Sequence, residues 1–248
     1  MTTMITSPQN EKLKLVRKLR ERRHREREGL FATEGEDLVE AGLAAGAEPR
    51  FLLSVPGGGL GGEEVDEELL AEVSALGSGT RAIAVWEQAW AARAESPCVY
   101  LHGVADPGNV GAIVRTAHGL LGGTVVLGPG CADPFGPKAV RASMGSIFGQ
   151  PLLRAGVERT PVPRAALVAH GGEPLSGLEG FATLCLGAER DGLPGEVLDA
   201  CDAQVTIPLR PSAESLNVAA AAAIGIERMR PDAERISSPA MRKAAADA

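Results

Sequence analysis

The sequence predicts an α/β protein with two domains, of which the second is built on a parallel sheet. At 248 residues the chain exceeds the usual size of a single domain. From residue 98 onward, near-continuous apolar strands alternate with helices, which is typical of a parallel sheet covered on both faces. Because a shorter alternation ends near residue 93, we expect a small α/β domain over 1–93, a linker over 94–97, a second domain over 98–231 and a frayed tail over 232–248.

The first domain opens with a strongly basic segment, QNEKLKLVRKLRERRHRERE at residues 9–28. This segment contains no Gly or Pro and has an apolar stripe at helical spacing, so we expect one helix. Its nine Lys and Arg outnumber its four Glu. Such a run forms either a solvated helix with internal ion pairs or a helix that binds phosphate groups. For the second interpretation the candidate residues are Arg22, Arg23 and Arg25.

The remaining elements follow in order along the chain. In the first domain we expect the strands LFATEG, FLLSV and RAIAVWE, with helices over 36–46 and 64–76. In the second domain we expect the strands CVYLHGV, GTVVLG, AALVAH, FATLCLG and AQVTIPL, with helices over 109–121, 137–148, 194–201 and 215–230. Pro137 and Pro194 stand where the first helical residue would be, which is the position that tolerates proline best.

Composition excludes several classes of protein. The net charge of −7 argues against a protein that coats nucleic acid along its whole surface. The four cysteines lack zinc-finger spacing, so we expect reduced, buried thiols and no metal site. The N-terminus has no apolar signal segment, and no apolar run is long enough to cross a membrane. We therefore expect a soluble cytoplasmic protein without a membrane partner.

Common catalytic and nucleotide-binding motifs are also missing. The stretch DPGNVGAIVRTA at 106–117 lacks the GxGxxG spacing of a dinucleotide-binding turn. The stretch GCADPFGPK resembles a phosphate loop, but Pro137 removes a backbone donor that such a loop needs. There is no GxSxG serine elbow, and the four histidines have no metal-ligand spacing. Conventional kinase, hydrolase and metalloenzyme interpretations are therefore weak.

Three strand–loop–helix junctions remain as candidate sites. In the first, we expect Asn109 to cap a helix, and Arg115 stands close enough to the expected helix start to oppose its dipole unless an anion lies beside it. The second is KAVRASMGSIFGQPL, which allows close backbone approach. The third places Glu189 between Gly187 and Gly192, followed by Ser215-Leu216-Asn217 at the start of a helix rich in alanine. We expect that helix to pack closely on another backbone or helix.

Together these junctions resemble the motifs of the SpoU (TrmH-type) family of RNA ribose methyltransferases. The resemblance covers PGNVGAIVRTA, SMGSIFGQPL and LGAERDGLPGEVLDACDAQVTIPL…ESLNVAAAAAI, over roughly residues 98–229. The stretches SPQNEKLKLVRKL and LFATEGEDLVEAGL resemble, more loosely, a substrate-binding module often joined to this family. The resemblance implies a deep trefoil knot in the C-terminal domain, a homodimer, S-adenosylmethionine as methyl donor and RNA, most of all ribosomal RNA, as substrate.

The resemblance also implies roles for individual residues. At the methyl-acceptor site it places Asn109, Arg115, Glu189, Ser215 and Asn217. At the cofactor it places the backbone of Gly187, Ile207 and Leu216. The family mechanism makes Arg115 the base, but guanidinium groups stay protonated in proteins. We expect Arg115 instead to bind a flanking phosphate and orient the 2′-hydroxyl, and we expect Arg22, Arg23 and Arg25 to bind the same RNA.

Three alternatives stay open. The chain could methylate transfer RNA rather than ribosomal RNA, or a base rather than a ribose. It could also be a non-catalytic RNA-binding protein that kept the fold. The combination of Asn109, Arg115, Glu189, Ser215 and Asn217 argues against this last alternative, since a scaffold has no need of all five. The sequence does not name the target nucleotide.

Overall fold

The computed structural model describes residues 4–230 except 76–78, 177, 179 and 211, so the expected tail over 232–248 lies outside the described residues. The chain forms two compact units. The first groups the described residues of 1–90, 106–115 and 132–150, and the second groups those of 91–105, 116–131 and 151–248. Two segments of the expected second domain, 106–115 and 132–150, therefore belong to the same compact unit as the N-terminal residues.

The first unit is built on a four-stranded mixed sheet with the order β1-β4-β2-β3. Strand β4 runs antiparallel to β1 and β2, and β3 runs parallel to β2. The strands are β1 (Leu30–Glu34), β2 (Phe51–Ser54), β3 (Glu63–Glu64) and β4 (Ala82–Glu87). The N-terminal helices are α1 (Glu11–Lys18), α2 (Arg22–Glu28), α3 (Glu36–Ala44) and α4 (Glu67–Val73). The small α/β domain expected from the sequence is thus confirmed.

The basic segment forms two helices, so the expectation of one helix over 9–28 is wrong. Helix α1 ends at Lys18 and α2 begins at Arg22. The guanidinium of Arg25 donates from Nη1 to the carbonyl oxygens of Leu19 and Arg20, both at 2.8 Å. These bonds satisfy two carbonyl groups that an unbroken helix would have satisfied internally. The side chain that compensates for the break, Arg25, belongs to the same segment. Helix propensity scores each residue without such side-chain bonds, so it does not predict the break.

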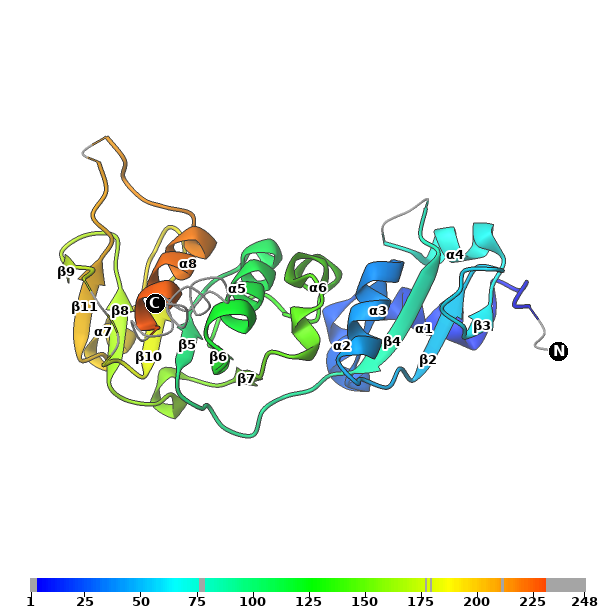
Figure 1. Ribbon diagram of the computed structural model, residues 1–248, viewed down its shortest axis with the longest axis horizontal. Helices are drawn as coiled ribbons and strands as arrows, with labels where there is room; N and C mark the ends of the chain where they lie inside the picture. The colour runs from blue at the N-terminus through cyan, green and yellow to red at the C-terminus, as the bar shows by residue number, and fades with distance from the viewer. Residues whose placement is uncertain (1–3, 76–78, 177, 179, 211, 231–248) are drawn as a thin grey trace, which may run out of the picture. The chain divides into compact units, whose positions relative to one another are not determined.

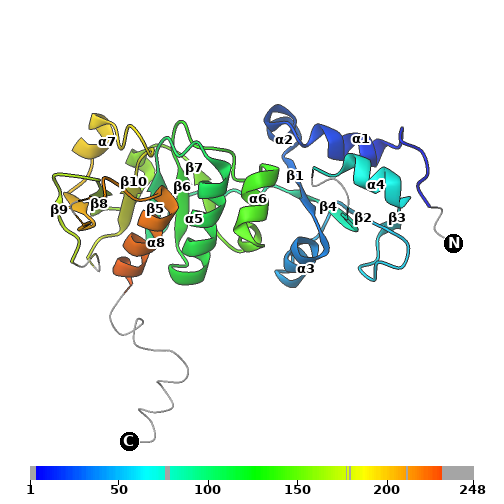
Figure 2. The ribbon, with the colours of Figure 1, turned by 90° about the horizontal axis from the view of Figure 1, so that it is seen from above.

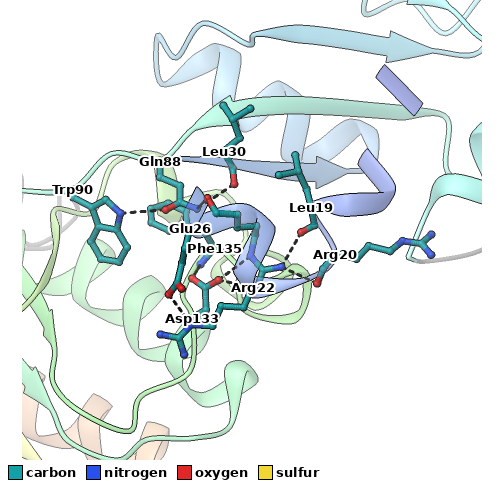
Figure 3. A network of polar contacts seen from close by, with 10 residues as sticks. Leu19, Arg20, Arg22, Glu26, Leu30, Gln88, Trp90, Asp133 and Phe135 are labelled. Carbon is teal, nitrogen blue, oxygen red and sulfur yellow. Dashed lines mark hydrogen bonds and ion pairs between the residues drawn. The ribbon is translucent and has the colours of Figure 1, made fainter. Parts of the chain in front are cut away.

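Arg25 is buried, unlike its neighbours on α2, and its partner Asp133 lies far along the chain. Figure 3 labels residues of the surrounding polar network, among them Leu19, Arg20 and Asp133. The Nε and Nη2 atoms of Arg25 lie 2.8 and 2.7 Å from Oδ2 of Asp133, whose own side chain is also buried. The other carboxylate oxygen of Asp133 accepts the backbone N–H of Phe135 at 3.0 Å. With its donors occupied inside the protein, Arg25 is a structural residue. The prediction that it binds RNA beside Arg22 and Arg23 is corrected.

Aromatic side chains hold residues 132–150 against the N-terminal sheet. The sequence contains only five Phe, two Trp and one Tyr. Five of these eight form one cluster: Phe31, Trp86, Trp90, Phe135 and Phe148. Ring centroids lie 4.9 Å apart for Phe31 and Phe135, and 4.8 Å apart for Trp86 and Phe148. Aromatic pairs at these distances add to the apolar burial of each ring, so the cluster forms an aromatic core within this unit.

The same unit contains α6 (Pro137–Ser143) and the first part of α5 (Pro107–Leu120). A helix over 137–148 was expected, but α6 ends earlier because Met144 takes a left-handed conformation with φ +48°. A short 3-10 turn, Ser146–Phe148, follows. Pro137 stands at the first position of α6, as expected.

The second unit is a seven-stranded sheet with the order β7-β6-β5-β10-β8-β11-β9, which can be followed from right to left in Figure 1. Every pairing in it is parallel, which confirms the expected parallel sheet. The strands are β5 (Cys98–Leu101), β6 (Thr124–Leu127), β7 (Leu152–Arg154), β8 (Arg164–Leu167), β9 (Glu173–Pro174), β10 (Thr183–Leu186) and β11 (Ala203–Thr206). Strands β7 and β9 were not expected from the sequence.

Two helices cover opposite faces of this sheet, α7 (Gly195–Asp199) and α8 (Val218–Met229) (Figure 2). On one face, Val197 of α7 packs in a core with Tyr100 and Cys185. On the other face, α8 lies so close to β10 that a Cβ added at Gly225 would be 2.6 Å from Leu184 Cδ2. Small residues therefore let α8 approach the sheet, as the alanine-rich sequence suggested. None of the helices in the described part of the chain is long and apolar enough to cross a bilayer.

The buried ion pair predicts a large stability difference between two arginines of one helix. Removing Arg25 by Arg25→Met leaves the buried carboxylate of Asp133 without its countercharge, so we expect the free energy of unfolding to fall by about 3–5 kcal/mol. Arg22 is exposed, and Arg22→Met should change the free energy of unfolding by less than about 0.5 kcal/mol.

Urea denaturation of the two variants checks this expectation. Adding Asp133→Leu to Arg25→Met should recover part of the loss, because the pair is then replaced by apolar groups. Equal stabilities for Arg25→Met and the wild-type protein would contradict the structural role of Arg25.

Candidate active site

A cavity of about 370 Å³ lies at the carboxyl ends of β8, β10 and β11 in the second unit. The lining includes the last residue of β8 and the three residues after it (167–170), and the last residue of β10 and the seven after it (186–193). Ile207 and Leu209 follow β11, and Val218 and Ala221 at the start of α8 complete the lining. Open parallel sheets bind their ligands at the carboxyl ends of the strands, and small-molecule sites measure roughly 300–1,000 Å³. Position and size both indicate a binding site for a small organic molecule.

The loop after β10 is a tight turn that needs glycine at both ends. Backbone hydrogen bonds join Ala188 and Gly192 in both directions, at 3.1 and 3.0 Å. Gly192 has φ +66°, and a Cβ at Gly187 would overlap the backbone of Gly192. The turn carries the exposed side chain of Glu189 at the edge of the cavity. Its two glycines therefore shape the loop that places this carboxylate.

Asn217 links the start of α8 to this loop. Its Oδ1 atom accepts the N–H groups of Ala219 and Ala220, at 2.9 and 3.3 Å, which makes Asn217 the N-cap of α8. The amide nitrogen then donates to Oε1 of Glu189 at 3.1 Å. Because capping fixes which amide atom faces the helix, the donor is directed toward Glu189. The expectation that this helix begins at Ser215 is wrong, since α8 begins at Val218.

The predicted cofactor residues meet at this cavity. Gly187, Ile207 and Leu216 all line it, although 29 positions of sequence separate the first from the last. Ser215 lines it as well, and Glu189 and Asn217 join each other at its edge. Much of the remaining wall is apolar, from Leu167, Leu186, Leu193 and Leu209. Such a cavity suits a ligand with a flat apolar part and a few polar groups.

Among the lining residues with polar side chains, sequence reasoning missed three: His170, Arg190 and Asp191. His170 follows the end of β8, and Arg190 and Asp191 sit in the turn after β10. Their positions just beyond parallel strands were the available signal, since these loops meet at one edge of the sheet. His170 was set aside for lack of metal-ligand spacing, which is no test of cavity lining.

Asn109 and Arg115 lie on α5 in the first unit. Helix α5 begins at Pro107, and Asp106 accepts the backbone N–H of Asn109 at 3.0 Å, so the expectation that Asn109 is the N-cap is wrong. Arg115 is exposed and stands past the middle of this 14-residue helix, where the dipole argument for an adjacent anion no longer holds. The assignment of both residues to the methyl-acceptor site stays a prediction.

None of the four cysteines lines the cavity. All four are free thiols; Cys98, Cys131 and Cys185 are buried and Cys201 is partly buried. Burial raises the pKa of the Cys98 thiol to about 12, which leaves it protonated at neutral pH. Covalent thiol catalysis therefore does not fit this site.

Family models define the class of protein to which this fold and site belong. A model described as the MRM3-like substrate binding domain matches residues 10–95. A model described as the SpoU rRNA Methylase family matches residues 96–227, which is more than half of the chain. The first compact unit therefore contains residues 10–90 of the matched substrate-binding domain, and the cavity lies within the matched methylase domain.

Individual relatives agree with the models over nearly the whole chain. The 23S rRNA (guanosine(2553)-2′-O)-methyltransferase RlmP of Bacillus subtilis is 32% identical over 247 residues, which cover 91% of this chain and 98% of that protein. The structure of an AdoMet-bound rRNA methyltransferase from Sinorhizobium meliloti matches with a TM-score of 0.79 at 27% identity, covering 95% of this chain and 99% of the other. A TrmH-family RNA methyltransferase structure from Porphyromonas gingivalis matches at 0.76 and 32%, covering 92% and 99%. The chain belongs to the SpoU rRNA methylase family.

The double role of Asn217 gives a test of the local structure. Asn217→Ala removes the acceptor at the start of α8, so we expect the free energy of unfolding of the second unit to fall by about 1 kcal/mol. Asn217→Ser keeps an uncharged acceptor of similar capping strength and loses the amide that donates to Glu189. It should therefore unfold close to wild type in thermal denaturation. Equal losses in the two variants would show that the bond to Glu189, rather than the cap, stabilises this junction.

Proposed function

We propose that the chain is an S-adenosylmethionine-dependent methyltransferase that methylates a ribose 2′-hydroxyl in ribosomal RNA. The observation that carries the proposal is the cavity at β8, β10 and β11, where the Glu189–Asn217 pair lies beside Gly187, Ile207 and Leu216. The cavity belongs to a chain of the SpoU family. A relative matched along almost its whole length, RlmP, is named for 2′-O-methylation of 23S rRNA.

The residues of the cavity fit the cofactor. Its volume of about 370 Å³ and its leucine-rich wall suit a nucleoside with a short amino-acid chain. The missing side chain of Gly187 brings the backbone of the turn to the cavity edge. We assign the adenine and methionine parts to the backbone of Gly187, Ile207 and Leu216. S-adenosylmethionine, when bound, supplies an electrophilic methyl group on a sulfonium.

The chain's own residues have the task of positioning the RNA. Arg115 carries an exposed guanidinium, whose planar fork suits a phosphate oxygen pair. We assign it to the phosphate beside the target ribose, where it orients the 2′-hydroxyl together with Asn109. The proton of that hydroxyl leaves to the phosphate or to water, because a guanidinium stays protonated. Positioning of this kind supplies a large part of the rate enhancement in group transfer.

The basic surface of α2 supports an RNA substrate. Arg22 and Arg23 are exposed, and each has an acidic neighbour, at 2.9 Å for Glu26 and 2.7 Å for Glu21. Exposed ion pairs of this kind are weak and exchange readily for phosphate contacts. The domain that contains them matches a substrate-binding family model. We assign Arg22 and Arg23 to sequence-independent contacts with the RNA backbone.

Three further features belong to the proposal: a deep trefoil knot in the C-terminal domain, a homodimer and a cytoplasmic location. Membership of the SpoU family supports the knot and the homodimer. On the alanine-rich α8, Ile224 is 38% exposed, which leaves apolar surface for a second copy.

The proposed activity is tested by methyl transfer. We expect labelled S-adenosylmethionine to yield one 2′-O-methylated nucleoside in 23S rRNA, supplied either as naked RNA or as ribosomal particles that lack the modification. Arg115→Lys should lower kcat by about 10-fold or more, since an ammonium does not reproduce the bidentate fork.

Nucleoside analysis of the labelled RNA separates the outcomes. A labelled base would show that the ribose is not the target, and labelled transfer RNA alone would replace the ribosomal substrate. Cofactor binding without any labelled RNA species, particles included, would favour a non-catalytic RNA-binding protein.

The assignment of Arg22 and Arg23 makes a prediction for binding. The single variants Arg22→Gln and Arg23→Gln should each weaken RNA binding and lower the slope of log K against log salt by about 0.7–0.9. Arg93→Gln is the matched control, because Arg93 is 82% exposed and pairs with Glu95 much as Arg23, at 75%, pairs with Glu21. Filter binding over a salt series measures both affinity and slope; equal slopes for Arg23→Gln and Arg93→Gln would argue against the assignment.

A further inference from the structure

The glycines of the PGNVG stretch serve packing between two helices rather than phosphate binding. Helices α5 and α6 touch along their backbones at Gly111. A Cβ added there would overlap the carbonyl oxygen of Ala139 and lie 2.7 Å from Ala142 Cβ. Glycine at this position therefore lets α5 lie directly against α6.

A single carboxylate joins the first turns of these helices. The Oδ1 atom of Asp106 accepts the backbone N–H of Asn109 at 3.0 Å, and its Oδ2 atom lies 2.6 Å from Nζ of Lys138 on α6. The hydrogen bond from Lys138, and next the N–H of Asn109, hold the pKa of Asp106 below its usual value. A Cβ at Gly108 would be 2.8 Å from Oδ1 of Asp106 and 3.3 Å from Cε of Lys138, so glycine leaves room for this pair.

The position of Lys138 calls for an explanation. It is the second residue of α6, where the helix dipole disfavours a cation. Asp106 offsets that cost and directs the ammonium toward α5. The two side chains are 44% and 58% exposed, for Asp106 and Lys138 respectively. Exposed ion pairs contribute little to stability. The effect of this pair is therefore to fix the position of α5 relative to α6.

Helix α6 is a firm support for such a contact. The loop before it is fixed by the buried pair of Asp133 and Arg25, and Phe135 packs against Phe31 and Trp90. Figure 3 shows Asp133, Phe135 and Trp90 in this region. The start of α5 is therefore tied, through Lys138, to the buried ion pair and the aromatic cluster of the first unit.

We propose that Asp106 and Lys138 are positioning residues for the methyl-acceptor site, because together they fix the first turn of α5, and so Asn109 and Arg115, against α6. This inference rests on the proposed function, in which Asn109 and Arg115 orient the ribose. Neither Asp106 nor Lys138 touches the reacting atoms; both act through α5.

The test uses the full-length protein and Lys138→Met. We expect kcat for RNA methylation to fall by about 10-fold or more, since small displacements of positioning groups are costly. The RNA KM, the affinity for S-adenosylmethionine and the melting temperature should stay near wild type. Lys138→Arg keeps a cation for Asp106 and should restore most of kcat. Arg141→Met removes another exposed cation of α6 and should change nothing.

Other patterns would overturn the inference. A rise in RNA KM with a lower salt slope would make Lys138 a phosphate contact. If the melting temperature of Lys138→Met falls in parallel with kcat, the pair of Asp106 and Lys138 only stabilises the fold. An unchanged kcat would show that the pair has no part in positioning the RNA.

A second readout separates this inference from the proposed function. Amide hydrogen exchange in the segment 107–115 should be faster in Lys138→Met than in wild type, whether or not RNA is methylated. If exchange responds but the wild-type protein methylates no RNA, the proposed function fails and the positioning of α5 stands. Unchanged exchange would overturn the positioning itself.

Discussion

Arg25 is a charged side chain buried between the two N-terminal helices and the loop that leads into α6. Burying a guanidinium is costly unless its donors find acceptors. Here Asp133 and the carbonyls of Leu19 and Arg20 supply them. This set of bonds explains why the basic segment breaks into two helices, and it fixes the loop at 133–136 against α2. The aromatic cluster and α6 follow directly from that loop, so the first unit depends on this buried charge.

In the second unit, the topology of the sheet determines where the residues of the cavity lie. Three adjacent parallel strands, β10, β8 and β11, end at one edge of the sheet, and their loops form the cavity. Helix α8 then returns to this edge, where Asn217 both caps the helix and reaches Glu189. The side-chain amide of Asn217 therefore both caps the helix and holds Glu189 in place at the cavity. Glycine at 187 and 192 allows the tight turn that makes the contact.

The sequence predicted the parallel sheet well because its central strands are continuous apolar runs, such as 98–101 and 183–186. It did not reveal β7 and β9, which have only three and two residues and no usable periodicity. The resemblance to the family identified residues that share the cavity, although pattern alone would not have joined positions so far apart.

Helix ends were harder to predict. Ser215 and Asn217 are both good capping residues, and so are Asp106 and Asn109. Composition does not decide which of two neighbouring residues becomes the N-cap. The choice depends on the tertiary partner of the capping side chain, which is Glu189 for Asn217 and Lys138 for Asp106. The burial of Arg25 was unpredictable for a similar reason, because its partner lies 108 positions away.

The aromatic cluster also determines which part of the protein its intrinsic fluorescence monitors in solution. The sequence contains two tryptophans, and Trp86 and Trp90 both belong to that cluster. Intrinsic tryptophan emission is therefore a probe of the first unit alone. The second unit contains the single tyrosine, Tyr100, in its buried core. Fluorescence excited at wavelengths that only tryptophan absorbs therefore follows the first unit. It carries no signal from the sheet that forms the cavity.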